Sequence, residues 1–243
     1  MGLLGNLRNA LRPKNIGVSE QQKESFNKPQ ADNSSINDDN LALTSPIRFI
    51  GKYANPFTIQ HAIEVNPNIK RILEEENLPV EFNIQNFNSI IMSHLIPTSK
   101  TTQKIYLNMG HKKEDADYLR LTQAALLHDI GKVFIPSEIL NKKGRLTPAE
   151  RKIVELHNRL SYEVIKTTNL NQRVAQFALE HHNYSKKVVS NHENQALTIA
   201  DVYCALREAR PYKKPYSDIA AKTILYDMGA KGQLDSRYIS CLF

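Results

Sequence analysis

One stretch near the end of the chain limits the fold more than any other. Residues 196–206 read Ala-Leu-Thr-Ile-Ala-Asp-Val-Tyr-Cys-Ala-Leu, and as a helix they are apolar on every side except at Thr198 and Asp201. A helix that is apolar all round is buried inside a protein. An ionised carboxylate in that setting is costly unless it is paired or bound to a metal ion. The stretch therefore predicts a buried helix with a polar site at Asp201.

The rest of the chain beyond Pro46 is also helical in pattern. Apolar residues recur at three-to-four spacing, and no convincing alternation typical of a half-buried strand is present. Thr147, Pro148 and Glu150 form a capping box with proline at the first helical position, which marks a helix start. Further helices are predicted near 68–78, 84–109, 113–129, 172–182, 194–208, 217–228 and 236–243. The predicted fold class is all-α.

Composition divides the chain into three parts. Residues 1–45 are poor in apolar side chains from 19 to 40 and carry equal numbers of acidic and basic residues, so we predict a disordered, low-complexity N-terminal tail. Residues 46–87 are a helical lead-in of unknown role, and residues 88–243 form the main domain. All of the net charge of +7 belongs to residues 46–243, which favours anionic partners.

Several protein classes are excluded or disfavoured by the same composition. Cys204 and Cys241 are too few for a disulfide framework or a cysteine-based zinc site, which indicates a reducing compartment, and we expect a cytoplasmic location. No apolar run approaches the roughly 20 residues of a transmembrane helix. No helix carries a stripe of Lys and Arg with exposed aromatics, so DNA binding is not expected.

Charged and polar residues stand where the pattern predicts a core. His128 and Asp129 follow the apolar run Ala-Ala-Leu-Leu, His157 borders the apolar stripe of its helix, and His181-His182 end another helix. Singly, each has an ordinary explanation, such as a helix cap, a core histidine bonded to a carbonyl, or a solvated helix end. Together they form a nitrogen and oxygen ligand set without thiolates, which suits Fe, Mn or Zn.

These motifs, in this order, resemble the HD-GYP branch of the HD metal-dependent phosphohydrolases. The resemblance rests on His128-Asp129-Ile130-Gly131-Lys132, on the Lys143–Thr147 segment, on His157 and His181-His182, and on Ala200–Tyr203 followed by Arg210–Lys214. It covers roughly residue 88 to the C-terminus. His94 stands 34 residues before His128, where the family places its first histidine. The resemblance implies an HD-domain helical bundle.

The resemblance also implies a ligand set and roles for single residues. One metal would be held by His94, His128, Asp129 and Asp201, and Asp129 would bridge to a second metal held by His157, His181 and His182. Two ions would acidify a bridging water to a hydroxide nucleophile and neutralise phosphate oxygens. Fe or Mn is the first expectation for the two divalent ions, and Zn, Mg or Ni are alternatives. Lys132, Arg210 and Lys213 would contact the substrate phosphate, with Asp129 and Lys132 as the catalytic pair.

Two departures from the family pattern bear on function. Ile90 stands where members with a third metal carry Glu, so we predict two metals. The Gly-Tyr-Pro loop after His182 is shortened and degenerate, with Asp201 only 19 residues further on. Ser161 also replaces the Gly that is usual four residues after the third histidine, a change expected to alter packing only slightly.

Three functions follow from this interpretation. The first is a dinuclear-metal phosphodiesterase that cleaves cyclic di-GMP or a related cyclic dinucleotide in bacterial signalling. The second is an HD phosphohydrolase that acts on another nucleotide or phosphorylated small molecule. The third is a non-catalytic nucleotide-binding module that signals to a protein partner through the N-terminal segment. We favour the enzyme because the ligand set is complete.

Overall fold

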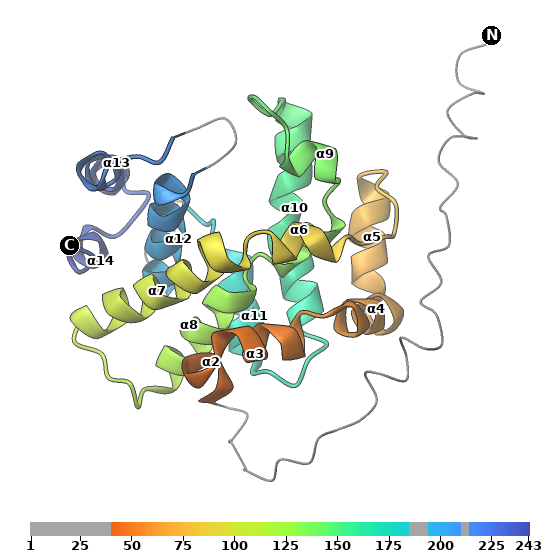
Figure 1. The fold of residues 1–243 in the computed structure, drawn as a ribbon, viewed down its shortest axis with the longest axis horizontal. Helices are drawn as coiled ribbons and strands as arrows, with labels where there is room; N and C mark the ends of the chain where they lie inside the picture. The colour runs from red at the N-terminus through yellow and green to blue at the C-terminus, as the bar shows by residue number, and fades with distance from the viewer. Residues whose placement is uncertain (1–39, 185–193, 210–213) are drawn as a thin grey trace. The chain divides into compact units, whose positions relative to one another are not determined.

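The computed structural model of the chain describes residues 40–184, 194–209 and 214–243. Every regular element in these ranges is a helix (Figure 1), so the predicted all-α fold is confirmed. The predicted tail lies almost wholly in residues 1–39, outside the described part of the chain, as do the degenerate loop at 185–193 and residues 210–213. No helix in the described ranges is long and apolar enough to cross a membrane.

The elements are, in chain order, α2 (Leu41–Thr44), α3 (Pro46–Tyr53), α4 (Pro56–Val65), α5 (Pro67–Glu75), α6 (Ile84–Asn88), the π-helix η2 (Ile91–Leu95), α7 (Ile96–Asn108), α8 (Ala116–Leu127), the 3₁₀-helix η3 (Ile130–Phe134), α9 (Ser137–Leu140), α10 (Pro148–Ile165), α11 (Gln172–Glu180), α12 (Gln195–Arg207), α13 (Asp218–Ala230) and α14 (Ser236–Ser240). The predicted helices all appear near their expected positions. The capping box at Thr147 and Glu150 is present as predicted, with both reciprocal hydrogen bonds formed.

The helix expected near 84–109 is the main difference from the prediction. It is broken into α6, η2 and α7, and the backbone N–H of Leu95 bonds the carbonyl of Ile90 five residues back, at 3.1 Å. Pro97 stands in the first turn of α7 and has no N–H to offer the preceding turn. Proline next to a widened turn of this kind is a common reason for a local π-helix, which often marks a functional position.

The lead-in segment starts its helices with a repeated signal, a proline in the first turn preceded by a polar cap. The side chain of Asn55 accepts hydrogen bonds from the first turn of α4, and Asn66 does the same for α5. Asn66 also donates to the carboxylate of Glu163 in α10 at 2.8 Å. Phe87 in α6 is fully buried and belongs to the same hydrophobic core as the later helices. The lead-in helices therefore pack on the main domain and share its core.

The first helix of the described residues begins before the expected boundary at residue 45. In α2, Ala42 is fully buried and the short helix packs on α3 and α8. The main body thus includes the last residues of the segment assigned to the tail.

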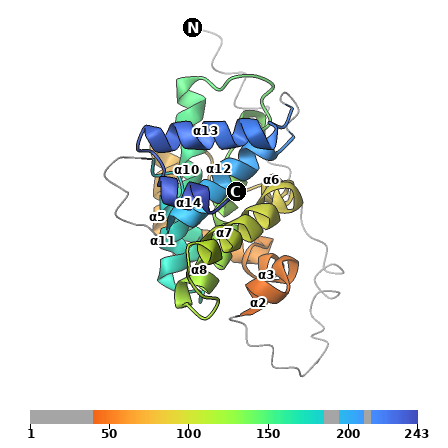
Figure 2. The same cartoon turned by 90° about the vertical axis from the view of Figure 1, so that its left-hand side faces the viewer.

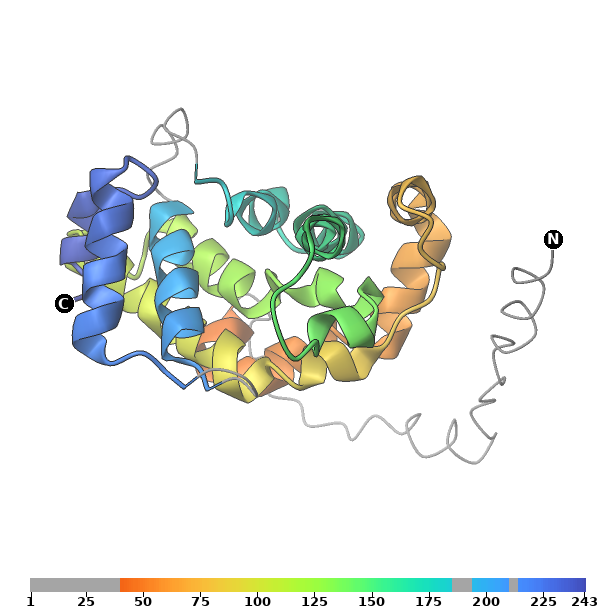
Figure 3. The same cartoon turned by 90° about the horizontal axis from the view of Figure 1, so that it is seen from above.

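The centre of the fold consists of α7, α8, α10, α11 and α12. Helix α8 packs on α7 and α11, α10 packs on α11 and η3, and α12 packs on α7. Figures 2 and 3 show α13 running beside α12, with α14 completing that side. Every residue of α12 from Gln195 to Asp201 is buried, as the apolar pattern predicted. This packing brings the ends of α8 and α11 close to the middle of α10 and α12.

Candidate metal centre

The structure brings all seven predicted metal-ligand residues together. They come from six places in the fold, namely His94 in η2, His128 at the end of α8, Asp129 at the start of η3, His157 in α10, His181-His182 at the end of α11, and Asp201 in α12. All are buried except His182, whose side chain is 32% exposed. The site is therefore enclosed, with one histidine at its opening.

Three of the histidines are oriented by the same local device. His128 and His181 lie at helix ends and His157 lies in the middle of α10. In each of them Nδ1 faces the backbone carbonyl three residues earlier: His128 on Ala125 at 3.0 Å, His157 on Val154 at 2.5 Å, and His181 on Ala178 at 2.6 Å. A carbonyl can only accept, so Nδ1 carries the proton and Nε2 keeps its lone pair. In all three residues Nε2 is buried without a hydrogen-bond partner in the described part of the chain. This is the usual outer support of a metal-binding histidine.

Asp129 lies between two groups of histidines. Its Oδ1 is 3.2 Å from Nε2 of His157, and its Oδ2 is 3.5 Å from Nε2 of His128 and 3.8 Å from Nε2 of His94. A carboxylate in this position can offer one oxygen to each of two cations. The bridging role that the family resemblance implies for Asp129 stays a prediction.

Asp201 joins the other residues from the side of α12. Its Oδ1 accepts a hydrogen bond from Nε2 of His94 at 2.9 Å and is 3.7 Å from Nε2 of His128. Its Oδ2 is 3.6 Å from Nδ1 of His182. The buried carboxylate that the sequence singled out is thus surrounded by imidazoles.

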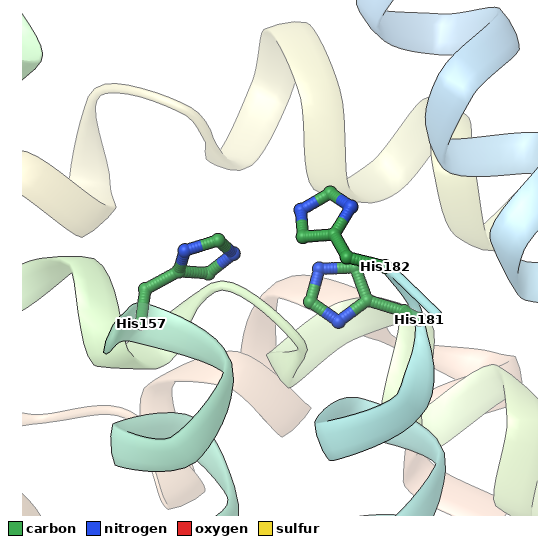
Figure 4. A group of neighbouring side chains, drawn as sticks. All are labelled: His157, His181 and His182. Carbon is green, nitrogen blue, oxygen red and sulfur yellow. The ribbon is translucent and has the colours of Figure 1, made fainter. Parts of the chain in front are cut away.

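Three overlapping groups in this cluster could hold a metal ion, because their ligand atoms lie within 4.8 Å of one another. They are His94 with His128 and Asp201, His128 with Asp129 and His181, and His157 with His181 and His182. Figure 4 shows the last group, in which the ring of His157 from α10 faces the two rings at the end of α11. Buried imidazole nitrogens without partners, beside carboxylates and without thiolates, fit divalent Fe, Mn or Zn.

Electrostatics keeps the carboxylates charged and two of the imidazoles neutral. Burial alone would raise the pKa of Asp129, but Lys132 and the neighbouring histidines hold it well below its ordinary value. The pKa of Asp201 is likewise lowered by His128 and His94 against the effect of burial. Burial lowers the pKa of His181, and it lowers that of His182 to about 4. Metal ligation requires these protonation states.

His128 shows the attraction of the site for positive charge. Burial lowers the pKa of its imidazole, but the carboxylates of Asp129 and Asp201 outweigh burial and raise that pKa above the ordinary value. The field that stabilises a proton on His128 also attracts a cation. Because proton and metal compete for the same nitrogen, a bound cation would replace the proton.

Lys132 is held next to the cluster rather than pointing freely to solvent. Its Nζ is 2.5 Å from Oδ2 of Asp129, and its side chain is 21% exposed. Lys132 and His94 line the same cavity of about 420 Å³, which Ile90, Lys142 and Glu208 also border. The lysine can therefore reach a ligand in this cavity. The other two predicted phosphate contacts, Arg210 and Lys213, lie outside the described residues.

Three residues around the cluster were not predicted as part of it. The hydroxyl of Tyr184 is 2.8 Å from Nδ1 of His182, and a carboxylate oxygen of Glu208 is 4.0 Å from Nδ1 of His94. Ser161 accepts a hydrogen bond from the backbone N–H of Gly131 at 2.9 Å, which is more than the slight packing change expected of it. Tyr184 stands two residues after the histidine pair, a signal that could have been noticed. Glu208 lies in a charged segment that is typical of a solvated helix end.

Comparison with known proteins finds a family of proteins that matches the part of the chain containing most of the cluster. Residues 85–186 match the model of the HD domain family. The resemblance to the HD-GYP branch that the motifs predicted is confirmed, and the shortened loop stays a prediction.

The chain is similar to several curated phosphodiesterases. It is 34% identical over 146 residues to a cyclic di-GMP phosphodiesterase response regulator of Xanthomonas campestris, an alignment that covers 55% of this chain and 38% of the relative. It is 35% identical over 103 residues to a cyclic di-GMP phosphodiesterase of Thermotoga maritima, covering 38% and 28%. It is 33% identical over 108 residues to 3'3'-cGAMP-specific phosphodiesterase 3 of Vibrio cholerae, covering 41% and 24%. The chain thus spans well under half the length of these relatives.

Proposed function

We propose that the protein is a dinuclear-metal phosphodiesterase that hydrolyses cyclic di-GMP or a related cyclic dinucleotide such as 3'3'-cGAMP. The observation that carries the proposal is the position of Asp129, with one carboxylate oxygen toward His157 and the other toward His128 and His94. The names of the similar proteins support the substrate class. Two divalent cations would supply an acidified water and neutralise charge on the phosphate oxygens.

The proposal gives each residue of the site a task. His94, His128, Asp129 and Asp201 would hold one cation, and Asp129 with His157, His181 and His182 would hold the second. We infer Fe or Mn, with Zn, Mg or Ni as alternatives, because the ligand atoms are all nitrogen and oxygen. The carbonyl contacts at Nδ1 orient His128, His157 and His181 before any cation binds, so little reorganisation is needed.

Lys132 would bind substrate and not metal: its task is to hold the substrate phosphate beside the cations. Its ammonium group contacts Asp129 and borders the cavity next to His94. A phosphate oxygen in this cavity would accept a hydrogen bond from Nζ while the cations neutralise its charge. Arg210 and Lys213 are proposed to contact the same substrate, from the segment that follows α12.

The proposal also includes the setting of the enzyme. Both cysteines of the chain are free, and Cys204 is buried in α12. Unpaired thiols are typical of a reducing compartment, which supports a cytoplasmic location. A signalling partner that binds through the N-terminal segment is part of this proposal, since one of the similar proteins is named a response regulator.

The test is hydrolysis of a panel of cyclic dinucleotides by protein purified without oxygen and loaded with Mn²⁺ or Fe²⁺. We expect linear or mononucleotide products with the wild type and none with Asp129→Ala. Asp227→Ala is the matched control, because Asp227 is an exposed residue of α13 whose carboxylate forms an ion pair with Lys231. The control should retain activity.

Other outcomes of the same assay separate the alternatives. Hydrolysis of phosphomonoesters but of no cyclic dinucleotide would replace the proposed substrate class. Saturable binding of cyclic dinucleotides without product would indicate a non-catalytic binding module. Either result contradicts the proposed phosphodiesterase.

A further inference from the structure

Tyr184 stands just after the end of α11 and lies against the histidine pair. The N–H of Asn183 bonds the carbonyl of Glu180 at 2.9 Å, and the N–H of Tyr184 bonds the carbonyl of His182 at 3.0 Å. With the chain turned back in this way, the ring centroids of Tyr184 and His182 are 5.7 Å apart. The hydroxyl of Tyr184 is 2.8 Å from Nδ1 of His182. A local turn therefore places a phenol on one particular histidine of the metal centre.

His182 is supported differently from the two histidines with which it shares a candidate metal group. In His157 and His181, Nδ1 faces a backbone carbonyl three residues earlier. Nδ1 of His182 faces a side chain instead, the hydroxyl of Tyr184. His182 is also the ligand residue at the opening of the site, with 32% of its side chain exposed. The phenol thus takes the place that a carbonyl has in His157 and His181.

The contact with Tyr184 leaves the other ring nitrogen of His182 toward the cluster. Figure 4 shows the two nitrogens of this ring on opposite sides, one of them toward His157. Nδ1 lies on the side of Tyr184 and of Asp201, whose Oδ2 is 3.6 Å away and so beyond hydrogen-bond distance. The nitrogen toward His157 is therefore Nε2. This agrees with the group of His157, His181 and His182, whose ligand atoms lie within 4.8 Å of one another.

The position of one proton decides whether His182 can bind a cation through Nε2. A neutral imidazole carries a single N–H, and a hydroxyl can either accept from it or donate to the bare nitrogen. If Nδ1 donates to the phenol oxygen, Nε2 keeps its lone pair, whereas a hydroxyl that donates to Nδ1 puts the ring proton on Nε2. The carboxylate of Asp201 favours the first arrangement, because its negative charge lies 3.6 Å from Nδ1 and attracts an N–H there. Burial raises the pKa of Tyr184, so the phenol stays neutral.

We propose that Tyr184 is a positioning residue of the metal centre, whose hydroxyl oxygen accepts a hydrogen bond from Nδ1 of His182 and so leaves Nε2 ready for the cation that His157 and His181 also hold. This inference rests on the proposed pair of cations. It adds to the seven ligands a residue that gives the most exposed of them the support that carbonyls give to His157 and His181. Tyr184 acts through His182, so its loss should change the affinity for one cation.

The first test determines the tautomer of His182 in the full chain after its metal ions have been removed. Long-range ¹⁵N–¹H NMR spectra of the histidine side chains distinguish a proton on Nδ1 from one on Nε2, and His182→Gln identifies the signals of His182. We expect the proton on Nδ1 in the wild type. In Tyr184→Phe, which removes only the hydroxyl, the form with the proton on Nε2 should increase. A proton on Nε2 of His182 in the wild type would overturn the proposal.

The second test measures cation affinity. Competition between the protein and a chelator for Mn²⁺ is compared in the wild type and in Tyr184→Phe at the same pH. We expect the variant to bind one of the two ions about tenfold more weakly, the lower end for loss of such a supporting group, and to bind the other ion as the wild type does. Unchanged affinity for both ions would overturn the proposal. Tighter binding in the variant would also overturn it, because the hydroxyl would then favour the wrong tautomer.

Tyr118→Phe is the matched control. Tyr118 in α8 is buried, and its hydroxyl donates to Gln103 at 3.1 Å, so this variant also removes one bonded hydroxyl. It should leave the tautomer of His182 and both cation affinities unchanged. If Tyr184 were only structural, both variants would lower the urea midpoint and keep the wild-type cation affinities, and that result would contradict the positioning role.

The outcomes also separate this inference from the proposed function. Unchanged affinities in Tyr184→Phe would end the role of Tyr184 and leave the phosphodiesterase proposal intact. Weaker binding of one ion by Tyr184→Phe, in a wild type that hydrolyses no cyclic dinucleotide, would support Tyr184 and contradict only the phosphodiesterase. A wild type that binds no cation would overturn both.

Discussion

Gly131 donates its backbone N–H to the hydroxyl of Ser161 at 2.9 Å, and both residues are buried. This contact joins the turn after His128 and Asp129 to α10, one turn beyond His157. The approach is so close that a Cβ atom on Gly131 would lie 2.2 Å from the carbonyl oxygen of His157 and 2.7 Å from the backbone N of Ser161. The two halves of the metal centre are thus fixed to one another by a glycine that has no room for a side chain.

Gly131→Ala should therefore destabilise the protein and disturb the metal centre together. The atoms in the way are backbone, which cannot rotate aside, so η3 must move away from α10. We expect a loss at the upper end of the 1–3 kcal/mol typical of overpacking, about 3 kcal/mol, in urea unfolding. Elemental analysis should show fewer bound metal ions per chain.

Gly51→Ala is the control for this change. Gly51 lies in α3, and a Cβ there would meet nothing within 4 Å. We expect it to be neutral or stabilising by about 0.5–1 kcal/mol, because alanine favours a helix over glycine. If both variants showed the same stability, the close contact of Gly131 with α10 would not be important.

Ser161→Ala tests the hydrogen bond without adding any atoms. The N–H of Gly131 would remain buried without its partner, which costs about 1–3 kcal/mol. Ser240→Ala removes a hydroxyl that bonds the carbonyl of Arg237 at an exposed position, and should cost less than about 0.5 kcal/mol. Chemical denaturation of both variants against the wild type gives the comparison. An equal cost for both would contradict the role of Ser161.

Much of the fold could be predicted from the sequence because the helices carry strong local signals. The apolar surroundings of Asp201 predicted a buried helix, and Thr147 with Glu150 predicted the start of α10. The prediction of a single helix over 84–109 was wrong. The sequence shows that Pro97 disturbs the preceding turn, but it does not show whether that turn widens into a π-helix or the helix ends there. The short helices α3 and α4 begin at Pro46 and Pro56, and these prolines mark their starts more clearly than the apolar periodicity does.

Only part of the candidate site could be predicted from the sequence. The seven residues proposed as ligands were selected because their types and order match a family pattern, and the structure brings them together. Gly131 and Ser161 show what such a pattern omits, since a backbone N–H bonded to a side chain 30 residues away leaves no local signal.

Glu208 should position His94. Nδ1 of His94 has no hydrogen-bond partner in the described residues, unlike Nδ1 of His128, His157 and His181, and Oε2 of Glu208 lies 4.0 Å from it. Ser93 donates to Oε1 of Glu208 at 2.8 Å and holds the carboxylate there. Glu208→Gln should weaken binding of one metal ion about tenfold, the lower end for such supporting groups. Competition with a chelator at fixed pH measures this.

Glu155→Gln is the matched control for Glu208, because Glu155 is an exposed residue of α10. It should leave both metal affinities unchanged. A Glu208→Gln variant that binds both ions as tightly as the wild type would show that His94 is held by η2 alone.

The start of α10 should make stability depend on pH. A hydrogen bond from Lys142 and the bond from the backbone of Thr147 lower the pKa of Glu150 below its ordinary value. A carboxyl whose folded pKa is lowered stabilises the fold above its unfolded pKa, and this contribution is lost as the pH falls through the folded pKa. Urea unfolding of the wild type and Glu150→Gln should therefore differ at pH 7 and converge as the pH falls through the lowered pKa of Glu150. A constant difference at all pH values would mean that the cap acts without its charge.

Metal stoichiometry should distinguish Asp129 from the ligands on either side. Because Oδ1 faces His157 and Oδ2 faces His128, Asp129→Ala should lose both ions, whereas His157→Ala should lose only one. Elemental analysis of protein purified without oxygen, with about two ions expected for the wild type, gives the counts. His61→Ala, on the lead-in helix α4, is the control and should keep both ions.

The two variants also separate a shared centre from two independent sites. If Asp129 bridges the two cations, Asp129→Ala should lose more metal ions per chain than His157→Ala, although each variant changes one side chain. The reason is that one carboxylate would then hold both cations. Independent sites would give equal counts of about one ion for Asp129→Ala and His157→Ala. That equality would remove the bridging role, and with it the arrangement on which phosphodiester hydrolysis by a metal pair depends.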